Sequence, residues 1–178
     1  VRGNAEMLTL QVNGNAGIPF EAGKKIVIET RMKQSDPGAR YYLKMNTNVL
    51  ENQEYNAYHT IFVNDNGTVT PANGVTSSGQ GNVYDGGITS TQLTTNDWLK
   101  IKIELVGDGT AAPTGTITYT DVNNASITDN VKVAVADTSS YVDALRTLEV
   151  RGRSSSTNQI FVDYLKVYTE KATNKIFK

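Results

Sequence analysis

The chain has 178 residues, 38% of them hydrophobic and 20% charged, which suits one domain with a single core. The formal net charge is −1 and no long block of lysine and arginine occurs, so the sequence argues against a nucleic-acid partner. There are no cysteines, which excludes disulfides and thiolate metal sites, and no apolar run approaches the roughly 20 residues that span a bilayer.

Strand-like runs follow one another along the chain, because Thr, Val, Ile and Tyr alternate repeatedly with polar residues. In chain order the clearest runs cover residues 6–12, 25–33, 40–46, 58–64, 98–106, 114–122, 131–136, 147–154 and 160–168. Residues 71–97 are rich in Gly, Ser, Thr and Asn, and we expect a surface loop there with room for a short strand. About nine or ten strands and no long helical pattern predict an all-β fold, a two-sheet antiparallel β-sandwich.

The domain organisation is simple. We expect a single domain over residues 1–170 and a tail or linker over residues 171–178. The first residues, VRGNAEM, resemble neither an initiator nor a secretory signal, so the sequence is interpreted as a piece of a longer chain with other domains.

The alternation also predicts which side of each strand faces the core. In the run 98–106, apolar residues fall at every second position and charged residues lie between them. An antiparallel sheet with one face in water produces this pattern. Trp98, which opens its run, is expected to cover the edge of the core rather than to meet a ligand. The residues predicted to face the core are Leu99, Ile101, Ile103, Leu105, Ile26, Ile28, Met32, Tyr41, Leu43, Met45, Leu148 and Val150.

Residues between the core positions supply candidates for a binding surface. Aromatic rings pack against the apolar faces of sugars, while forked donors bind hydroxyls or carboxylates. Lysine and arginine on such a surface suit a uronate or another acidic glycan. An ordinary solvated face is the alternative that stays open. The candidate ligand-binding residues are Tyr42, Lys44, Asn46, Tyr58, Arg151 and Arg153.

Asp163 lies in the middle of the last run, IFVDYLKVY, among aromatic and β-branched residues. An ionised carboxylate inside a sheet is unfavourable unless it is paired, hydrogen-bonded or bound to a cation. Two interpretations of Asp163 stay open. In the first, Asp163 lies at a sheet edge, where it faces water or pairs with a lysine; in the second, it binds a cation.

Five pieces in order carry a family resemblance: GNAEMLTL, KKIVIETRMK, IFVNDNGTV, NDWLKIKIEL followed by GTITYTD, and the terminal IFVDYLKVY. Together they resemble the concanavalin A-like, laminin-G-like jelly roll in its carbohydrate-binding-module form. The resemblance implies a jelly-roll β-sandwich, a fold that hosts lectins, binding modules, lyases and hydrolases. Domains of this type often join their first and last strands through calcium, which takes about six to eight oxygen ligands. The resemblance thus implies a structural calcium at Asp163, with Asn4 and Glu6 as side-chain partners.

Catalytic constellations are scarce. Hydrolases of this fold place carboxylates on alternate residues of one strand, whereas Glu51 and Glu54 have neither that spacing nor a strand context. Related alginate lyases use an arginine, a glutamine, a histidine and a tyrosine. His59 is the single histidine, and its neighbour Tyr58 should point to the opposite face of a strand. No GxSxG, GxGxxG or P-loop phrase occurs.

The sequence therefore predicts a non-catalytic carbohydrate-binding module that binds a plant or microbial polysaccharide, acidic ones included, with calcium as a structural ion. The alternatives are a polysaccharide lyase on the same jelly-roll fold and a structural or adhesive surface domain. The expected partners are a polysaccharide or oligosaccharide and other domains of a bacterial polysaccharide-degrading or surface protein. We expect no nucleic acid and no membrane insertion, and a location outside the cell or on its surface.

Overall fold

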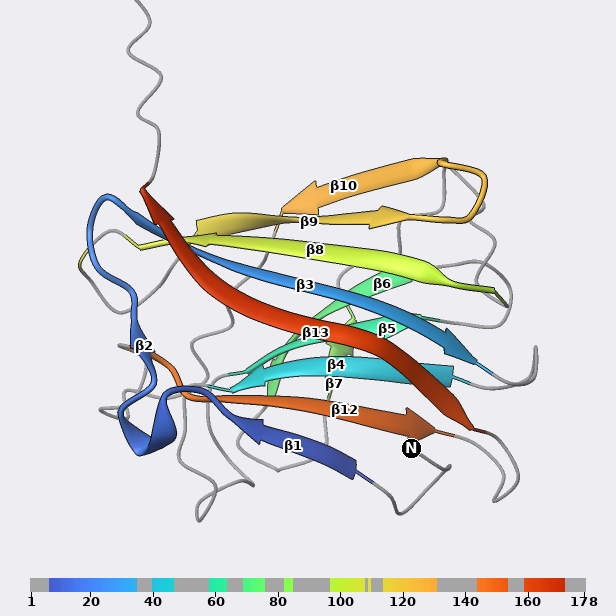
Figure 1. Cartoon of the computed structure of the whole chain (residues 1–178), viewed down its shortest axis with the longest axis horizontal. Coiled ribbons are helices and arrows are strands. Elements are labelled where there is room, and N and C mark those ends of the chain that lie inside the picture. The colour runs from blue at the N-terminus through green and yellow to red at the C-terminus, as the bar shows by residue number, and fades with distance from the viewer. Residues whose placement is uncertain are drawn as a thin grey trace, which may run out of the picture.

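In a computed structural model, the chain forms two antiparallel β-sheets that lie one over the other (Figure 1). The structure describes residues 7–34, 40–46, 58–63, 69–75, 82–84, 97–107, 109, 114–130, 144–153 and 159–171. This part of the chain forms thirteen strands and one short 3-10 helix, and it contains no α-helix. The predicted two-sheet antiparallel sandwich is confirmed.

The first sheet has six strands in the order β1-β12-β4-β5-β6-β7. All neighbouring strands in it are antiparallel. Because β12 lies between β1 and β4, this sheet joins segments from both ends of the sequence. Its strands are β1 (Met7–Gln11), β4 (Arg40–Asn46), β5 (Tyr58–Val63), β6 (Val69–Val75), β7 (Asn82–Tyr84) and β12 (Thr147–Arg153).

The second sheet has five strands in the order β10-β9-β8-β3-β13. Its edge strand β13, drawn in red, crosses in front of the other sheet in Figure 1. The strands of this sheet are β3 (Lys24–Gln34), β8 (Leu99–Val106), β9 (Thr114–Thr120), β10 (Ser126–Asn130) and β13 (Ile160–Lys171). Outside both sheets, the 3-10 helix η1 (Gly14–Ala16) precedes β2 (Ile18–Pro19), which pairs with β11 (Ala144–Leu145).

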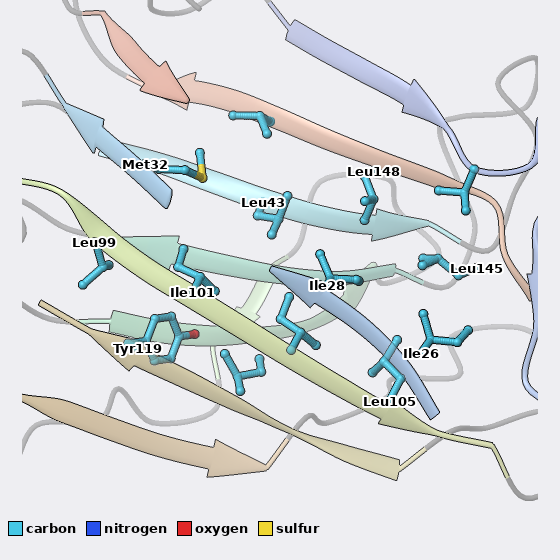
Figure 2. Packing of buried hydrophobic residues seen from close by; sticks show 14 of the residues in the cluster. Ile26, Ile28, Met32, Leu43, Leu99, Ile101, Leu105, Tyr119, Leu145 and Leu148 are labelled. Atoms are coloured by element: carbon cyan, nitrogen blue, oxygen red, sulfur yellow. The ribbon is translucent and has the colours of Figure 1, made fainter. Parts of the chain in front are cut away.

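The core fills the space between the two sheets (Figure 2). In β8, buried residues alternate with more exposed ones, as the sequence pattern predicts. Each buried aliphatic side chain of this size contributes roughly 1.5–3 kcal/mol to stability. Ten of the twelve predicted core residues are buried with at most 1% of their surface exposed, namely Leu99, Ile101, Ile103, Leu105, Ile26, Ile28, Met32, Leu43, Leu148 and Val150. The side chains of Tyr41 and Met45 lie outside the described ones.

The sequence pattern does not predict β10, the second strand of the hairpin with β9. Its sequence, SITDN, contains a single large apolar residue and so shows no alternation. The turn of the hairpin is stabilised by Asp121, whose Oδ1 accepts hydrogen bonds from the backbone N–H of Asn123 (2.8 Å) and of Ala125 (3.0 Å). Hydroxyl pairs across the strands, such as Thr118 with Thr128 at 2.9 Å, add to the backbone ladder. Local polar contacts therefore define this hairpin.

The segment 71–97 also contains more strand than expected. β6 runs through Pro71 and Gly74, two residues that usually weaken a strand, and it carries a bulge between Asn73 and Val75. β7 pairs with it. Residues 85–96 of this segment lie outside the described part.

The ends of the predicted elements differ slightly from the observed ones. β13 continues through Lys171, the first residue of the predicted tail. The predicted run 131–136 and residues 172–178 lie outside the described part. No helix among the described residues is long and apolar enough to cross a membrane.

Candidate functional site

The predicted ligand-binding residues occupy neighbouring strands of the six-stranded sheet, where the structure describes their backbone and register. Tyr42 of β4 is directly opposite Arg151 of β12. The next pair along the same two strands, Leu43 and Val150, is buried in the core. Because successive residues of a strand belong to opposite faces, Tyr42 and Arg151 both belong to the outer face of this sheet.

The other four candidates follow by the same alternation. Asn46 lies two positions beyond Lys44 on β4 and is opposite Tyr58 of β5. Arg153 lies two positions beyond Arg151 on β12. All six candidates therefore belong to one outer face, on the adjacent strands β12, β4 and β5. We call this set the β4 platform: Tyr42, Lys44, Asn46, Tyr58, Arg151 and Arg153.

Two further charged residues join the β4 platform by register. Arg40 is directly opposite Arg153, and Glu149 is directly opposite Lys44. Arg40 is absent from the predicted set, because it begins its run and its partner strand is distant in sequence. The pairing brings a third arginine to this face.

His59, the candidate base of a lyase, belongs to the other face of β5. It is opposite Met45 of β4 and Asn73 of β6. Ile61, two positions further along β5, is opposite the buried Leu43. Register thus assigns His59 to the core-facing row, in agreement with the expectation that His59 and Tyr58 lie on opposite faces.

Asp163 lies at a bulge in the edge strand β13. The pairing with β3 is regular up to Val162 and resumes at Tyr164, so Asp163 is the extra residue. A bulge of this kind turns two successive residues toward one side of a sheet. Val162 and Leu165 pack against the core, while Asp163 is exposed. The bulge therefore explains how a carboxylate is accommodated in this apolar run.

The partner of Asp163 within the described residues is Arg31 of β3. Its Nη1 lies 3.1 Å from Oδ2 of Asp163. The same part of the chain contains no cluster of three acidic, histidine or cysteine residues suited to a metal ion. The predicted partners Asn4 and Glu6 lie outside the described residues. Calcium at Asp163 thus stays a prediction, and an arginine already neutralises the carboxylate.

Arg31 is also the centre of a cluster that the sequence reasoning missed. Its guanidinium carbon lies 4.9 Å from the centroid of the Trp98 ring. Lys100 and Tyr164 are directly opposite Arg31 on the two neighbouring strands. We call Arg31, Trp98, Lys100, Asp163 and Tyr164 the Arg31 cluster. Trp98 thus contacts an arginine on the outer face. Alternation predicts the face of each residue, whereas the pairing of β3 with β8 brings the two residues together.

A carboxylate just before β8, that of Asp97, flanks the Arg31 cluster. Oδ1 of Asp97 accepts a 2.7 Å hydrogen bond from the backbone N–H of Trp98 and lies 3.5 Å from Nζ of Lys33. The hydrogen bond from the Trp98 N–H, helped by the charges of Lys33 and Arg31, lowers the pKa of Asp97. The Asp97 carboxylate is therefore ionised at neutral pH and compensates Lys33.

A second ion-pair network connects β3, β8 and β13 on the same outer face, toward the end opposite to the Arg31 cluster. Nζ of Lys25 lies 2.6 Å from Glu104 of β8 and 2.9 Å from Glu170 of β13. Hydrogen bonds to Glu104 and then Glu170 raise the pKa of Lys25 to about 12. The hydrogen bond from Lys25 lowers the pKa of Glu104, with a smaller effect from Lys102. Charge in this network is balanced within the protein.

Comparisons with known proteins identify the fold. The sequence matches no protein-family model, and a search of curated proteins finds no significant match. The structure is similar to a family 7 alginate lyase, A1-II′, in complex with product: the TM-score is 0.54 at 14% identity, over 96% of this chain and 75% of that chain.

Two glycoside hydrolases are similar as well. A Bacteroides ovatus mixed linkage glucan GH16 in complex with product gives a TM-score of 0.50 at 10% identity, over 91% of this chain and 80% of that chain. An engineered GH43 enzyme with endo-xylanase and exo-arabinofuranosidase activity gives 0.53 at 12% identity, over 94% of this chain and 34% of that chain. This chain thus spans about a third of the GH43 protein. These likenesses show the fold, a jelly-roll β-sandwich, and so confirm the predicted fold class.

Proposed function

We propose that this chain is a non-catalytic carbohydrate-binding module that binds a polysaccharide on the β4 platform. The observation that carries the proposal is the register, which brings six candidates from three distant segments to one outer face. The structural neighbours support a carbohydrate-related role, because they include an alginate lyase, a mixed linkage glucan GH16 and a GH43 glycoside hydrolase.

The charges of this face favour an acidic polysaccharide. By register, Arg40, Lys44, Arg151 and Arg153 share the face with one carboxylate among the described residues of the six-stranded sheet, that of Glu149. Arginine binds carboxylates through two parallel hydrogen bonds, and the two tyrosines of the β4 platform supply rings for stacking on sugars.

The assignment of His59 to the core-facing row supports a role without catalysis. A polysaccharide lyase is the second candidate, and the likeness to the alginate lyase favours it. A general base must reach the proton that it abstracts. His59 belongs to the face opposite to Tyr58, so the two residues do not form one catalytic pair on the β4 platform.

Two further parts of the proposal rest on the sequence resemblance. One is a structural calcium at Asp163. The other is an extracellular or cell-surface location beside other domains of a polysaccharide-degrading or surface protein. A structural or adhesive domain is the remaining alternative, and it would bind no polysaccharide.

Affinity gel electrophoresis tests the proposed binding. The parent should be retarded in gels that contain at least one of pectin, alginate, xylan or β-glucan. Tyr42→Ala and Arg151→Ala should each raise the dissociation constant of the β4 platform, obtained from the retardation, about fivefold or more. Each substitution removes a contact of about 1 kcal/mol or more. Tyr168→Ala and Lys171→Ala remove the same kinds of group from β13 and should migrate like the parent. Equal retardation of all four variants would place the site elsewhere.

A lyase assay separates the two candidates. Cleavage by a lyase leaves an unsaturated uronide that absorbs in the ultraviolet. We expect no increase in absorbance when the protein is incubated with alginate or pectin. An increase that His59→Ala abolishes would establish the lyase instead.

A further inference from the structure

The Arg31 cluster lies on the outer face of the five-stranded sheet, on the opposite side of the sandwich from the β4 platform. Arg31 has Lys100 directly opposite on β8 and Tyr164 directly opposite on β13. Thr120 of β9 is opposite Lys100 and extends the row. With neighbouring strands about 4.8 Å apart, the four residues form a row about 14 Å long across the sheet. This length accommodates a short stretch of an extended ligand.

Positive charge in this row exceeds the negative charge beside it. Lys100 and Arg31 are like charges directly opposite each other, an arrangement that destabilises a sheet. Asp163 compensates Arg31, and Asp97 compensates Lys33, two positions further along β3 on the same face. Lys100 is exposed and forms no ion pair with the other described residues. An anion bound at Lys100 would neutralise this row.

Three aromatic residues, Trp98, Tyr164 and Phe161, lie on the same outer face as Lys100. The Trp98 ring stacks with the guanidinium of Arg31, and Nζ of Lys166 lies 4.9 Å from the centroid of the Tyr164 ring. Phe161, with 42% of its surface exposed, is opposite Lys33 on the same face. Stacking and ion pairing fix the guanidinium plane before a ligand arrives. A carboxylated sugar matches this surface, because it offers a carboxylate, hydroxyls and an apolar ring face.

We propose that the Arg31 cluster is a second glycan site, which binds a carboxylated polysaccharide through Lys100, Arg31 and Trp98. The proposal rests on the proposed function for its class of ligand, but the two sites share no residue. Since the sites lie on opposite faces of the sandwich, one molecule binds two polysaccharide strands and crosslinks them. Two linked sites also raise the overall avidity without any new contact.

Crosslinking of soluble polysaccharide tests this inference. Turbidity and viscosity are measured on polygalacturonate and alginate with the parent, Lys100→Gln, the double variant Tyr42→Ala/Arg151→Ala, and all three substitutions combined. The parent should crosslink. Lys100→Gln should weaken the second site about tenfold and abolish crosslinking, while retardation in acidic gels persists through the β4 platform. Lys171→Gln, which removes an exposed lysine at the end of β13, is the matched control and should crosslink like the parent.

The outcomes separate the two sites. Lys100→Gln protein that crosslinks and binds like the parent overturns the inference, as does a parent that binds acidic polysaccharide without crosslinking it. Failure of the β4 platform looks different, because the double variant would then be retarded like the parent while Lys100→Gln would not be retarded. A parent that binds no acidic polysaccharide overturns the inference as well.

Discussion

Thr30 is a hydroxyl residue in the core-facing row of β3, with 0% of its surface exposed. Its Oγ1 donates a 2.8 Å hydrogen bond to the backbone carbonyl of Tyr164, at the bulge of β13. We predict that Thr30→Val lowers the free energy of unfolding by about 1–3 kcal/mol, because the carbonyl then loses its donor. Thr118→Val removes a more exposed hydroxyl, paired with Thr128, and should cost less than about 0.5 kcal/mol. Urea unfolding that gives equal losses for the two variants would contradict this role of Thr30.

The carboxylate of Asp163 pairs with the guanidinium of Arg31. The proposed calcium ion would compete with Arg31 for this carboxylate. A cation that binds only the folded chain stabilises it by RT ln(1 + [L]/Kd). We therefore predict that a chelator lowers the melting temperature of the parent and has no effect on Asp163→Ala. A melting curve of the parent that is unchanged in chelator would remove calcium and leave Arg31 as the partner of Asp163.

The bulge itself left a signal in the sequence. The core-contacting residues of β13 are Ile160, Val162, Leu165 and Val167, with steps of two, three and two. The step of three breaks the alternation at Asp163 and so marks the bulge. The sequence does not predict that Arg31 is the partner of Asp163. Arg31 lies 132 positions away in the chain, and only the fold shows that its strand is the neighbour of β13.

Three strands of the second sheet are joined by the ion pairs of Lys25 with Glu104 and Glu170. The pKa of Lys25 is raised from 10.5 to about 12, so its contribution is full below pH 10.5 and is lost as the pH rises through about 12. The pKa of Glu104 is lowered from 4.5, so its contribution is full above pH 4.5 and is lost as the pH falls below that value. Between these limits the network stabilises the sheet.

We predict that Lys25→Met, which keeps the alkyl chain, lowers the free energy of unfolding by about 1 kcal/mol at neutral pH. The difference from the parent should shrink below pH 4.5 and again as the pH approaches 12. Denaturant unfolding at a series of pH values measures it. A difference that is constant across this range would show that packing, and not charge, accounts for the loss.

The pairing of β8 with β9 depends on Gly115. A Cβ atom at this position would lie 2.1 Å from the carbonyl oxygen of Glu104 on the neighbouring strand. We predict that Gly115→Ala separates the two strands locally and lowers the free energy of unfolding by about 1–3 kcal/mol. Thr116→Ala, at the next position of β9, is the control. Thermal unfolding in which both variants melt like the parent would contradict the close approach.

Strands with strict alternation were predictable one by one. In β8, four apolar residues at alternate positions specify both the strand and its buried face. β10 was not predictable in this way, because its hairpin depends on the polar turn at Asp121 and on hydroxyl pairs. β6 was not predicted in full, because Pro71 and Gly74 are typical of turns. Its pairing with β5 shows that this segment is a strand.

At the scale of the whole molecule, the alternation predicts two sheets but not their strand order. β12 pairs with β1 and β4, about a hundred or more positions away in the chain, and no local pattern encodes that pairing. The same gap explains the candidate sites. The residues of the β4 platform were predicted from their types, whereas the Arg31 cluster required the register of β3 with β8 and β13.

A polysaccharide site on the β4 platform is tested by backbone amide chemical shifts. They are recorded by NMR during titration with an oligosaccharide of the glycan that retards the protein. We predict that the largest shifts at low ligand concentration fall in residues 40–46, 58–63 and 147–153, the strands of the β4 platform. With an acidic oligosaccharide, a second group should shift around residues 31, 98–100 and 164. Shifts confined to residues 76–96, or spread evenly over the chain, would contradict a polysaccharide site on the six-stranded sheet.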